Sequence, residues 1–89
     1  MDKKVLEVLK NQKEKFNIDK FVLFGSFVKS DKYNDIDIAY ISKQKLNFQK
    51  YLDLERDLED KLNTKIDLLN FDKINPLIKI NAKKDFVYV

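Results

Sequence analysis

The chain of 89 residues is short for two domains, and its 44% hydrophobic and 37% charged residues are typical of a folded globular protein. It has no Cys and no His, which excludes disulfides, zinc–thiolate sites, Ser–His triads and His-based metal sites. Its net charge is +3, with Lys residues scattered among the acids, so we expect a solvated surface and no direct nucleic-acid binding. No apolar run is long enough to span a membrane and the N-terminus does not resemble a signal peptide, so we expect a cytoplasmic location.

The N-terminal half of the sequence predicts one helix and two strands. Asp2 can cap a helix that ends at Asn17 and carries one apolar stripe. The segment Lys20–Phe24 is apolar, rich in aromatic residues and bounded by the only glycine, which predicts a buried strand. After a polar connection at 26–34, the alternating segment Asp35–Ile41 predicts a second strand. The stripe of the helix consists of Val5, Leu6, Val8, Leu9 and Phe16.

A second long helix is predicted after a Lys-rich loop. Asn47 can cap its N-terminus, the pattern continues through Leu62, and Asn63 suits a left-handed C-terminal cap. Asp57 and Lys61 are spaced for a favourable ion pair on this helix. Its predicted apolar face consists of Phe48, Tyr51, Leu52, Leu54, Leu58 and Leu62.

The remaining segments complete an alternation of helices and strands. Lys65–Asn70 predicts a third strand, Pro76 fits the first turn of a last helix after Asn75, and Phe86–Val89 predicts an edge strand. This order predicts an α/β (α+β) fold with two layers, in which helices flank a mixed β-sheet. We therefore expect residues 1–89 to form a single domain.

The only glycine lies where the first predicted strand ends. Gly25 allows the backbone to turn sharply and to approach a ligand closely. Free backbone amides after it, together with the hydroxyl of Ser26, can bind an anion such as phosphate. A simple turn is the alternative, because Gly-Ser is common after strands.

Asp35 and Asp37 are two residues apart on a predicted strand, so both carboxylates project from one face. Two carboxylates about 4 Å apart repel each other by roughly 4 kcal/mol at an effective dielectric of about 20. A compensating cation would remove this repulsion, and an all-oxygen ligand set suits Mg²⁺ or Mn²⁺. The alternative is a pair of solvated acids at a fraying strand end.

Asp67 interrupts the otherwise apolar third strand. If this strand neighbours the strand of Asp35, three carboxylates converge on one face of the sheet. We expect no basic partner for them on the same strand, which is the pattern of a divalent-metal site.

These residues resemble the minimal nucleotidyltransferase family, a branch of the DNA-polymerase-beta-like nucleotidyltransferase superfamily. The family pattern is a hydrophobic strand, Gly-Ser, a spacer, Asp-x-Asp and a later strand with a third Asp. The spacer here has eight residues, slightly fewer than in the family pattern, and Ser30 stands where Gly is frequent; both would tighten the phosphate loop. The matching residues are Gly25, Ser26, Asp35, Asp37 and Asp67.

The resemblance implies a role for each matching residue. The Gly-Ser pair would hold the β- and γ-phosphates of ATP, and Lys29 would contact phosphate. The aspartates would bind two Mg²⁺ ions, or Mn²⁺, and Asp67 would also orient or deprotonate the acceptor hydroxyl. The implied nucleotide-binding residues are thus Gly25, Ser26 and Lys29, and the implied catalytic and metal-binding residues are Asp35, Asp37 and Asp67.

Small stand-alone members of this family resemble antitoxins whose partner is a HEPN-type ribonuclease toxin. The resemblance implies transfer of AMP from ATP to a tyrosine hydroxyl of that partner. Because we expect no acceptor domain after the third Asp, the acceptor would dock from outside or come from a second copy of the chain. Two alternatives stay open: neutralisation of the partner by binding alone, or transfer to a small-molecule hydroxyl. Self-modification at Tyr33 or Tyr40 is a further alternative. Candidate apolar residues for partner binding are Phe27, Tyr33, Phe86 and Tyr88.

Overall fold

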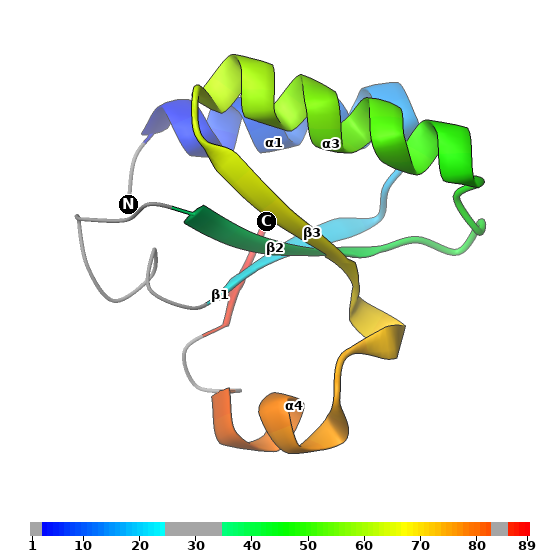
Figure 1. Ribbon diagram of the computed structural model, residues 1–89, viewed down its shortest axis with the longest axis vertical. Coiled ribbons are helices and arrows are strands. Elements are labelled where there is room, and N and C mark those ends of the chain that lie inside the picture. Colours follow the sequence, from blue (N-terminus) through cyan, green and yellow to red (C-terminus); the bar gives the residue numbers. More distant parts are fainter. Residues whose placement is uncertain (1–2, 25–34, 83–85) are drawn as a thin grey trace.

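The computed structural model describes residues 3–24, 35–82 and 86–89, and these residues form a sheet with helices on both sides (Figure 1). The predicted order of helices and strands is confirmed, with a short 3-10 helix added after the third strand. The predicted cap Asp2 and the connection 26–34 lie outside the described residues. The elements in chain order are α1 (Lys3–Phe16), β1 (Lys20–Phe24), β2 (Asp35–Ile41), α3 (Phe48–Leu62), β3 (Lys65–Asn70), η1 (Phe71–Lys73), α4 (Pro76–Ala82) and β4 (Val87–Tyr88).

The four strands of the described chain form one mixed sheet in the order β3-β2-β1-β4. β1 pairs antiparallel with both β2 and β4, whereas β2 and β3 are parallel. Two parallel neighbours need a crossover connection, and α3 provides it. The predicted mixed sheet and the predicted edge position of the last strand are both confirmed.

One face of the sheet is covered by α1 and α3, which lie side by side above it in Figure 1; we call it the helix-covered face. The alternation of β2 sends its even-numbered residues to this face, as expected. The sheet and both helices bury one continuous cluster there. Its members are Val5, Leu9, Ile18, Phe21, Leu23, Ile36, Ile38, Tyr40, Leu54, Leu58, Ile66 and Leu68.

The ends of α3 are confirmed, but two predictions about its sides are wrong. The Asn47 side chain accepts a hydrogen bond from the Lys50 backbone N–H at 2.8 Å, and Asn63 has a left-handed φ of 51°. Phe48, expected on the apolar face, is 75% exposed. Asp57 pairs with Lys15 of α1 at 2.6 Å instead of with its helical neighbour, because the two helices pack against each other.

The other face of the sheet, which we call the site face, carries the odd-numbered side chains of β2 and β3. The segment from η1 to α4 lies on this side and covers only part of it (Figure 1). A small buried cluster forms under this segment. It consists of Val22, Ala39 and Ile74, with Phe24, Ile41, Phe71 and Phe86 packed around it.

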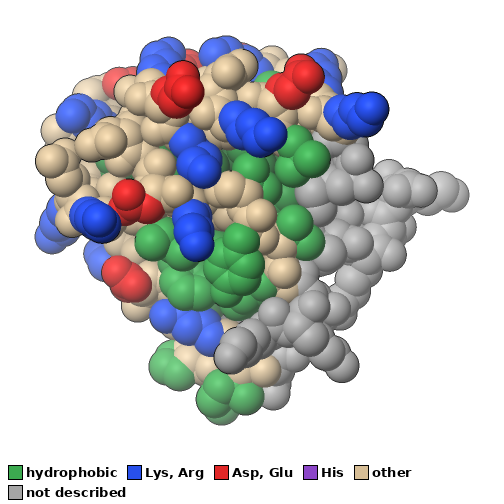
Figure 2. All heavy atoms as spheres, turned by 180° about the vertical axis from the view of Figure 1, so that it is seen from behind, with side chains coloured by type: hydrophobic (Ala, Val, Ile, Leu, Met, Phe, Trp, Pro, Cys, Tyr) green, Lys and Arg blue, Asp and Glu red, His purple; other side chains and the backbone are tan. Residues whose placement is uncertain are grey.

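On the surface opposite to the view of Figure 1, Lys and Arg side chains lie among acidic ones and around a group of hydrophobic side chains (Figure 2). This distribution agrees with the scattered charges expected from the sequence. In the part of the chain that the structure describes, no helix is both long enough and apolar enough to cross a membrane.

Candidate active site

Asp37 and Asp67 lie next to each other on the site face. They are direct register partners in the parallel pair β2–β3, so their side chains point to the same side of the sheet. Phe24 is the register partner of Asp37 on β1. Phe24, Asp37 and Asp67 therefore form one row across three strands, and we call it the acidic row. The condition set in the sequence analysis, that the strand of Asp67 neighbours the strand of Asp35, is confirmed.

The position of Asp37 raises the pKa of its carboxyl group above the ordinary value. Partial burial is the largest cause, followed by the negative charge of Asp67, a side-chain hydrogen bond with Asp67, and the charge of Asp35. All four effects favour the protonated form of Asp37 over the ionised form. The acidic row thus stores a local excess of negative charge that a proton or a cation relieves.

The neighbourhood of Asp35 includes a lysine of the adjacent strand. Its register partner on β3 is Lys65, which lies two residues before Asp67 on the same face. A lysine therefore stands next to Asp35 on the site face. Among the described residues Lys65 and Asp35 form no ion pair; the ion pair found there joins Lys15 of α1 to Asp57 of α3.

The three aspartates supply only oxygen donors, which suits Mg²⁺ or Mn²⁺ and not a thiol- or imidazole-seeking metal. Asp37 and Asp67 are adjacent, and Asp35 is close enough to raise the pKa of Asp37. Within residues 3–24, 35–82 and 86–89, no three side chains of His, Cys, Asp or Glu are close enough together to hold a metal ion as they stand. The described arrangement that fits a metal is thus a pair of carboxylates in register, Asp37 and Asp67.

The predicted phosphate-binding residues Gly25, Ser26 and Lys29 lie outside the described residues, as do Phe27 and Tyr33. The structure describes β1 up to Phe24, which belongs to the acidic row. The Gly-Ser pair therefore follows in the sequence directly after a residue of that row. That these residues bind phosphate stays a prediction.

Three of the other candidate residues lie in the described part of the chain. Tyr40 is buried on the helix-covered face, where its pKa is raised mainly by burial, so it is not placed to react at the acidic row. Phe86 packs edge-on against Phe24 and Phe71, with ring centroids 5.8 and 5.9 Å apart. Tyr88 is 52% exposed and contacts the ring of Phe86.

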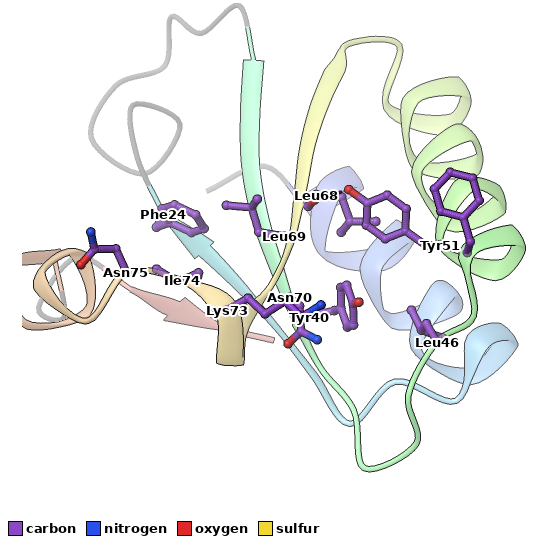
Figure 3. A pocket seen from close by; sticks show the side chains of 11 residues that line it. Phe24, Tyr40, Leu46, Tyr51, Leu68, Leu69, Asn70, Lys73, Ile74 and Asn75 are labelled. Carbon is purple, nitrogen blue, oxygen red and sulfur yellow. Dashed lines mark hydrogen bonds between the residues drawn. The ribbon is translucent and has the colours of Figure 1, made fainter.

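A hollow of about 530 Å³ lies beside the acidic row (Figure 3). Phe24, a member of the row, lines it, and so does Leu69, two residues after Asp67 on the same face. The hollow continues past η1 and around β3 to the other side of that strand. No motif in the sequence indicates this hollow, but the alternation of β3 puts Leu69 on the face of Asp67 and could have indicated one lining residue. The lining residues are Phe24, Tyr40, Leu46, Phe48, Tyr51, Leu68, Leu69, Asn70, Lys73, Ile74 and Asn75.

Comparison of the sequence with known proteins agrees with this arrangement. The family model "Polymerase beta, Nucleotidyltransferase" matches residues 3–88. A putative protein adenylyltransferase of Methanocaldococcus jannaschii is 31% identical over 83 residues, which cover 90% of this chain and 85% of the relative. A second putative protein adenylyltransferase of the same organism is 34% identical over 80 residues, covering 86% and 82%.

Three solved structures share the fold. A mutant of the toxin–antitoxin MntA–HpeT has a TM-score of 0.70 at 19% identity, covering 96% of this chain and 68% of that one. The structure of a tri-AMPylated Shewanella oneidensis HEPN toxin in complex with MNT antitoxin has a TM-score of 0.65 at 22% identity, covering 96% of this chain and 65% of that one. A toxin–antitoxin with AMP-PNP has a TM-score of 0.66 at 21% identity, covering 89% of this chain and 66% of that one.

The family match spans nearly the whole described chain and includes all three aspartates of the predicted motif. The resemblance drawn from the Gly-Ser pair and these aspartates is therefore confirmed at the level of the family. The chain belongs to the polymerase-beta nucleotidyltransferase family.

Proposed function

We propose that this chain is a cytoplasmic, Mg²⁺-dependent antitoxin that transfers AMP from ATP to a tyrosine hydroxyl of a HEPN-type ribonuclease toxin. The observation that carries the proposal is the placement of Asp37 beside Asp67 on the half-open site face. The names of the relatives, putative protein adenylyltransferases, support adenylyl transfer to a protein. The similar fold of an MNT antitoxin, in complex with a tri-AMPylated HEPN toxin, supports the kind of partner.

In this proposal residues 1–89 act as one domain, and the acids and the phosphate loop divide the work. Bound Mg²⁺ would neutralise charge on the transferring phosphate and on the leaving pyrophosphate. The acids would hold that metal, and the residues after β1 would hold the β- and γ-phosphates through backbone amides, the Ser hydroxyl and the Lys ammonium. The proposed metal-binding and catalytic residues are Asp35, Asp37 and Asp67, and the proposed phosphate-binding residues are Gly25, Ser26 and Lys29.

The transfer is a single displacement at the α-phosphorus of ATP. The phenol oxygen of the acceptor forms a bond to that phosphorus, and the bond between the phosphorus and its bridging oxygen to the β-phosphate breaks. Pyrophosphate leaves with the bonding electron pair, and the phenol proton passes to the carboxylate of Asp67 or to water. Asp67 suits this role because it lies at the edge strand β3, where an acceptor can approach.

The two faces of the sheet determine from which side the acceptor arrives. The helix-covered face is closed by α1 and α3, whereas the acidic row lies on the face that η1 and α4 cover only in part. The acceptor must therefore approach from the site face. A tyrosine on the surface of a docked protein satisfies this requirement.

The proposal is tested by incubating the chain with ATP, Mg²⁺ and its candidate toxin, and by weighing the toxin by mass spectrometry. We expect a mass increase of one or more AMP groups with the natural chain, and none with Asp37→Asn or Asp67→Asn. Asp72→Asn is the matched control, because Asp72 is an exposed carboxylate of η1 outside the acidic row. This control is expected to retain full activity.

Two results would contradict the proposal. Absence of an adduct with every nucleotide tried would exclude transfer to this partner. If Asp37→Asn still protects cells from the toxin as well as the natural chain does, neutralisation would occur by binding alone.

A further inference from the structure

We propose that the hollow beside the acidic row binds the base of the nucleotide, between the side chains of Phe24, Leu69 and Ile74. This inference rests on the proposed function, because it places one part of the nucleotide that the reaction would use. It adds a base-binding site on residues outside the Gly-Ser and Asp motif. All three side chains line the site-face part of the hollow (Figure 3).

The distance along the strands suits a bound nucleotide. Leu69 follows Asp67 by two residues on the same face of β3, which corresponds to about 7 Å at the usual rise of a strand. A nucleotide with its α-phosphate at the acidic row would span this distance with its ribose. Its base would then lie against Leu69 and Phe24.

The walls of this part of the hollow are apolar and well supported. The ring of Phe24 contacts the ring of Phe86 edge-on at 5.8 Å, which restricts its orientation. Ile74 is nearly fully buried in the small cluster of the site face, whereas Leu69 is 45% exposed and open to a ligand. Flat heteroaromatic rings bind such walls by stacking and by removal of apolar surface from water.

The rim of the hollow presents hydrogen-bond donors. Asn75 accepts the Leu77 backbone N–H at 2.9 Å with its side-chain oxygen, so its amide NH₂ remains to donate to a ligand. Lys73 adds an ammonium group at the same rim. Ring nitrogens of a nucleobase accept such bonds. The ring of an acceptor tyrosine could not accept hydrogen bonds from Asn75 and Lys73, because its one polar atom, the hydroxyl oxygen, must lie at the acidic row.

The same hollow has a second part that serves as an internal control. On the other side of β3 it is lined by Tyr40, Leu46 and Tyr51 (Figure 3). Phe48, the first residue of α3, also lines the hollow. Tyr51 donates a hydrogen bond to the Leu68 carbonyl at 2.6 Å and so occupies part of the strand edge between the two parts. A ligand with its α-phosphate at the acidic row would not extend around this edge, so substitutions there should leave nucleotide binding unchanged.

The experiment compares two ligands by calorimetric titration of the full chain with Mg²⁺ present: ATP, which has a base, and inorganic tripolyphosphate, which has none. We expect the natural chain to bind ATP more tightly than tripolyphosphate. Phe24→Leu and Leu69→Ala should each lower the affinity for ATP roughly fivefold and leave the affinity for tripolyphosphate unchanged. Asn75→Asp keeps the oxygen that accepts the Leu77 N–H but loses the donor, so it should reduce the ratio of the two affinities. Phe48→Ala should change neither.

Each result bears on the inference. Equal affinities of the natural chain for ATP and tripolyphosphate, or equal losses for both ligands in the variants, would overturn the base site while leaving adenylyl transfer possible. A loss with Phe48→Ala as large as with Leu69→Ala would place the base on the other side of β3 and also overturn it. Absence of binding of either ligand by the natural chain would contradict the proposed function together with the inference.

Discussion

The two faces of the same sheet are built for different purposes. The helix-covered face buries one continuous apolar cluster between the sheet, α1 and α3. The site face buries a much smaller cluster and leaves Asp37 and Asp67 side by side next to an open hollow. Adjacent strands thus send apolar side chains to one face and acidic ones to the other, because side chains alternate along a strand.

This contrast explains how a small chain can tolerate repulsion at its candidate active site. Burial of apolar side chains on the helix-covered face supplies most of the favourable free energy of folding. The like charges of the acidic row are confined to the face that contributes least to this burial. Substitutions on the helix-covered face should therefore mainly lower stability, whereas substitutions on the site face should mainly affect ligand binding.

The largest expected effect on stability is on the helix-covered face. Leu58 of α3 is fully buried, so Leu58→Ala should lower the free energy of unfolding by about 3 kcal/mol through lost burial and a residual cavity. Leu69→Ala, the same change on the site face, should cost less than about 1 kcal/mol because this side chain is half exposed. Urea denaturation of both variants measures the difference. Equal losses would show that the two faces contribute equally to folding.

A stabilising substitution of intermediate size is expected at Gln12. This residue of α1 is fully buried, and within the described residues neither polar atom of its side chain has a hydrogen-bond partner. An unsatisfied buried amide costs about 1–3 kcal/mol, so Gln12→Met should raise the free energy of unfolding by about 1–2 kcal/mol.

Gln49→Met is the control for Gln12→Met, since it makes the same change at an exposed position of α3. Gln49 donates one surface hydrogen bond to Asp53, so its substitution should change stability little. Thermal denaturation of both variants gives the comparison. A clear loss of stability in Gln12→Met would indicate that an internal water satisfies the natural side chain.

Local signals in the sequence predicted most of the fold. Asn47 and Asn63 delimit α3 by capping, and the alternation of Asp35–Ile41 correctly separates the two faces of β2. The acidic pair could be predicted for the same reason, once β2 and β3 were taken as neighbours. The burial of Gln12 in α1 was not predicted, because a glutamine does not count toward an apolar stripe.

The remaining features depend on contacts between distant segments. The ion pair of Asp57 with Lys15 follows from the packing of α3 on α1, which the spacing along one helix cannot reveal. The hollow beside the acidic row forms because η1 brings Ile74 back over the site face. The register of β2 with β3, which places Lys65 beside Asp35, likewise depends on tertiary pairing.

The smallest expected effect on stability concerns the acidic row itself. Asp37→Asn removes a carboxylate whose pKa is raised by burial, by Asp67 and by Asp35, so in the absence of metal at pH 7 the variant should be more stable. We expect a gain below about 1 kcal/mol, because much of the carboxylate is exposed and solvent screens the repulsion.

The sign of the pH dependence follows from the raised pKa of Asp37. The folded chain holds the proton of Asp37 more tightly than the unfolded chain, so its stability falls as pH rises from the unfolded pKa through the higher folded pKa. Melting curves across this range should show that slope in the natural chain and a smaller one in Asp37→Asn. Asp60→Asn, which removes an exposed carboxylate of α3, should keep the slope of the natural chain. Added Mg²⁺ should raise the melting temperature of the natural chain and of Asp60→Asn more than that of Asp37→Asn. An equal rise in all three would show that the ion binds elsewhere. The acidic row would then be a source of repulsion without a metal to relieve it.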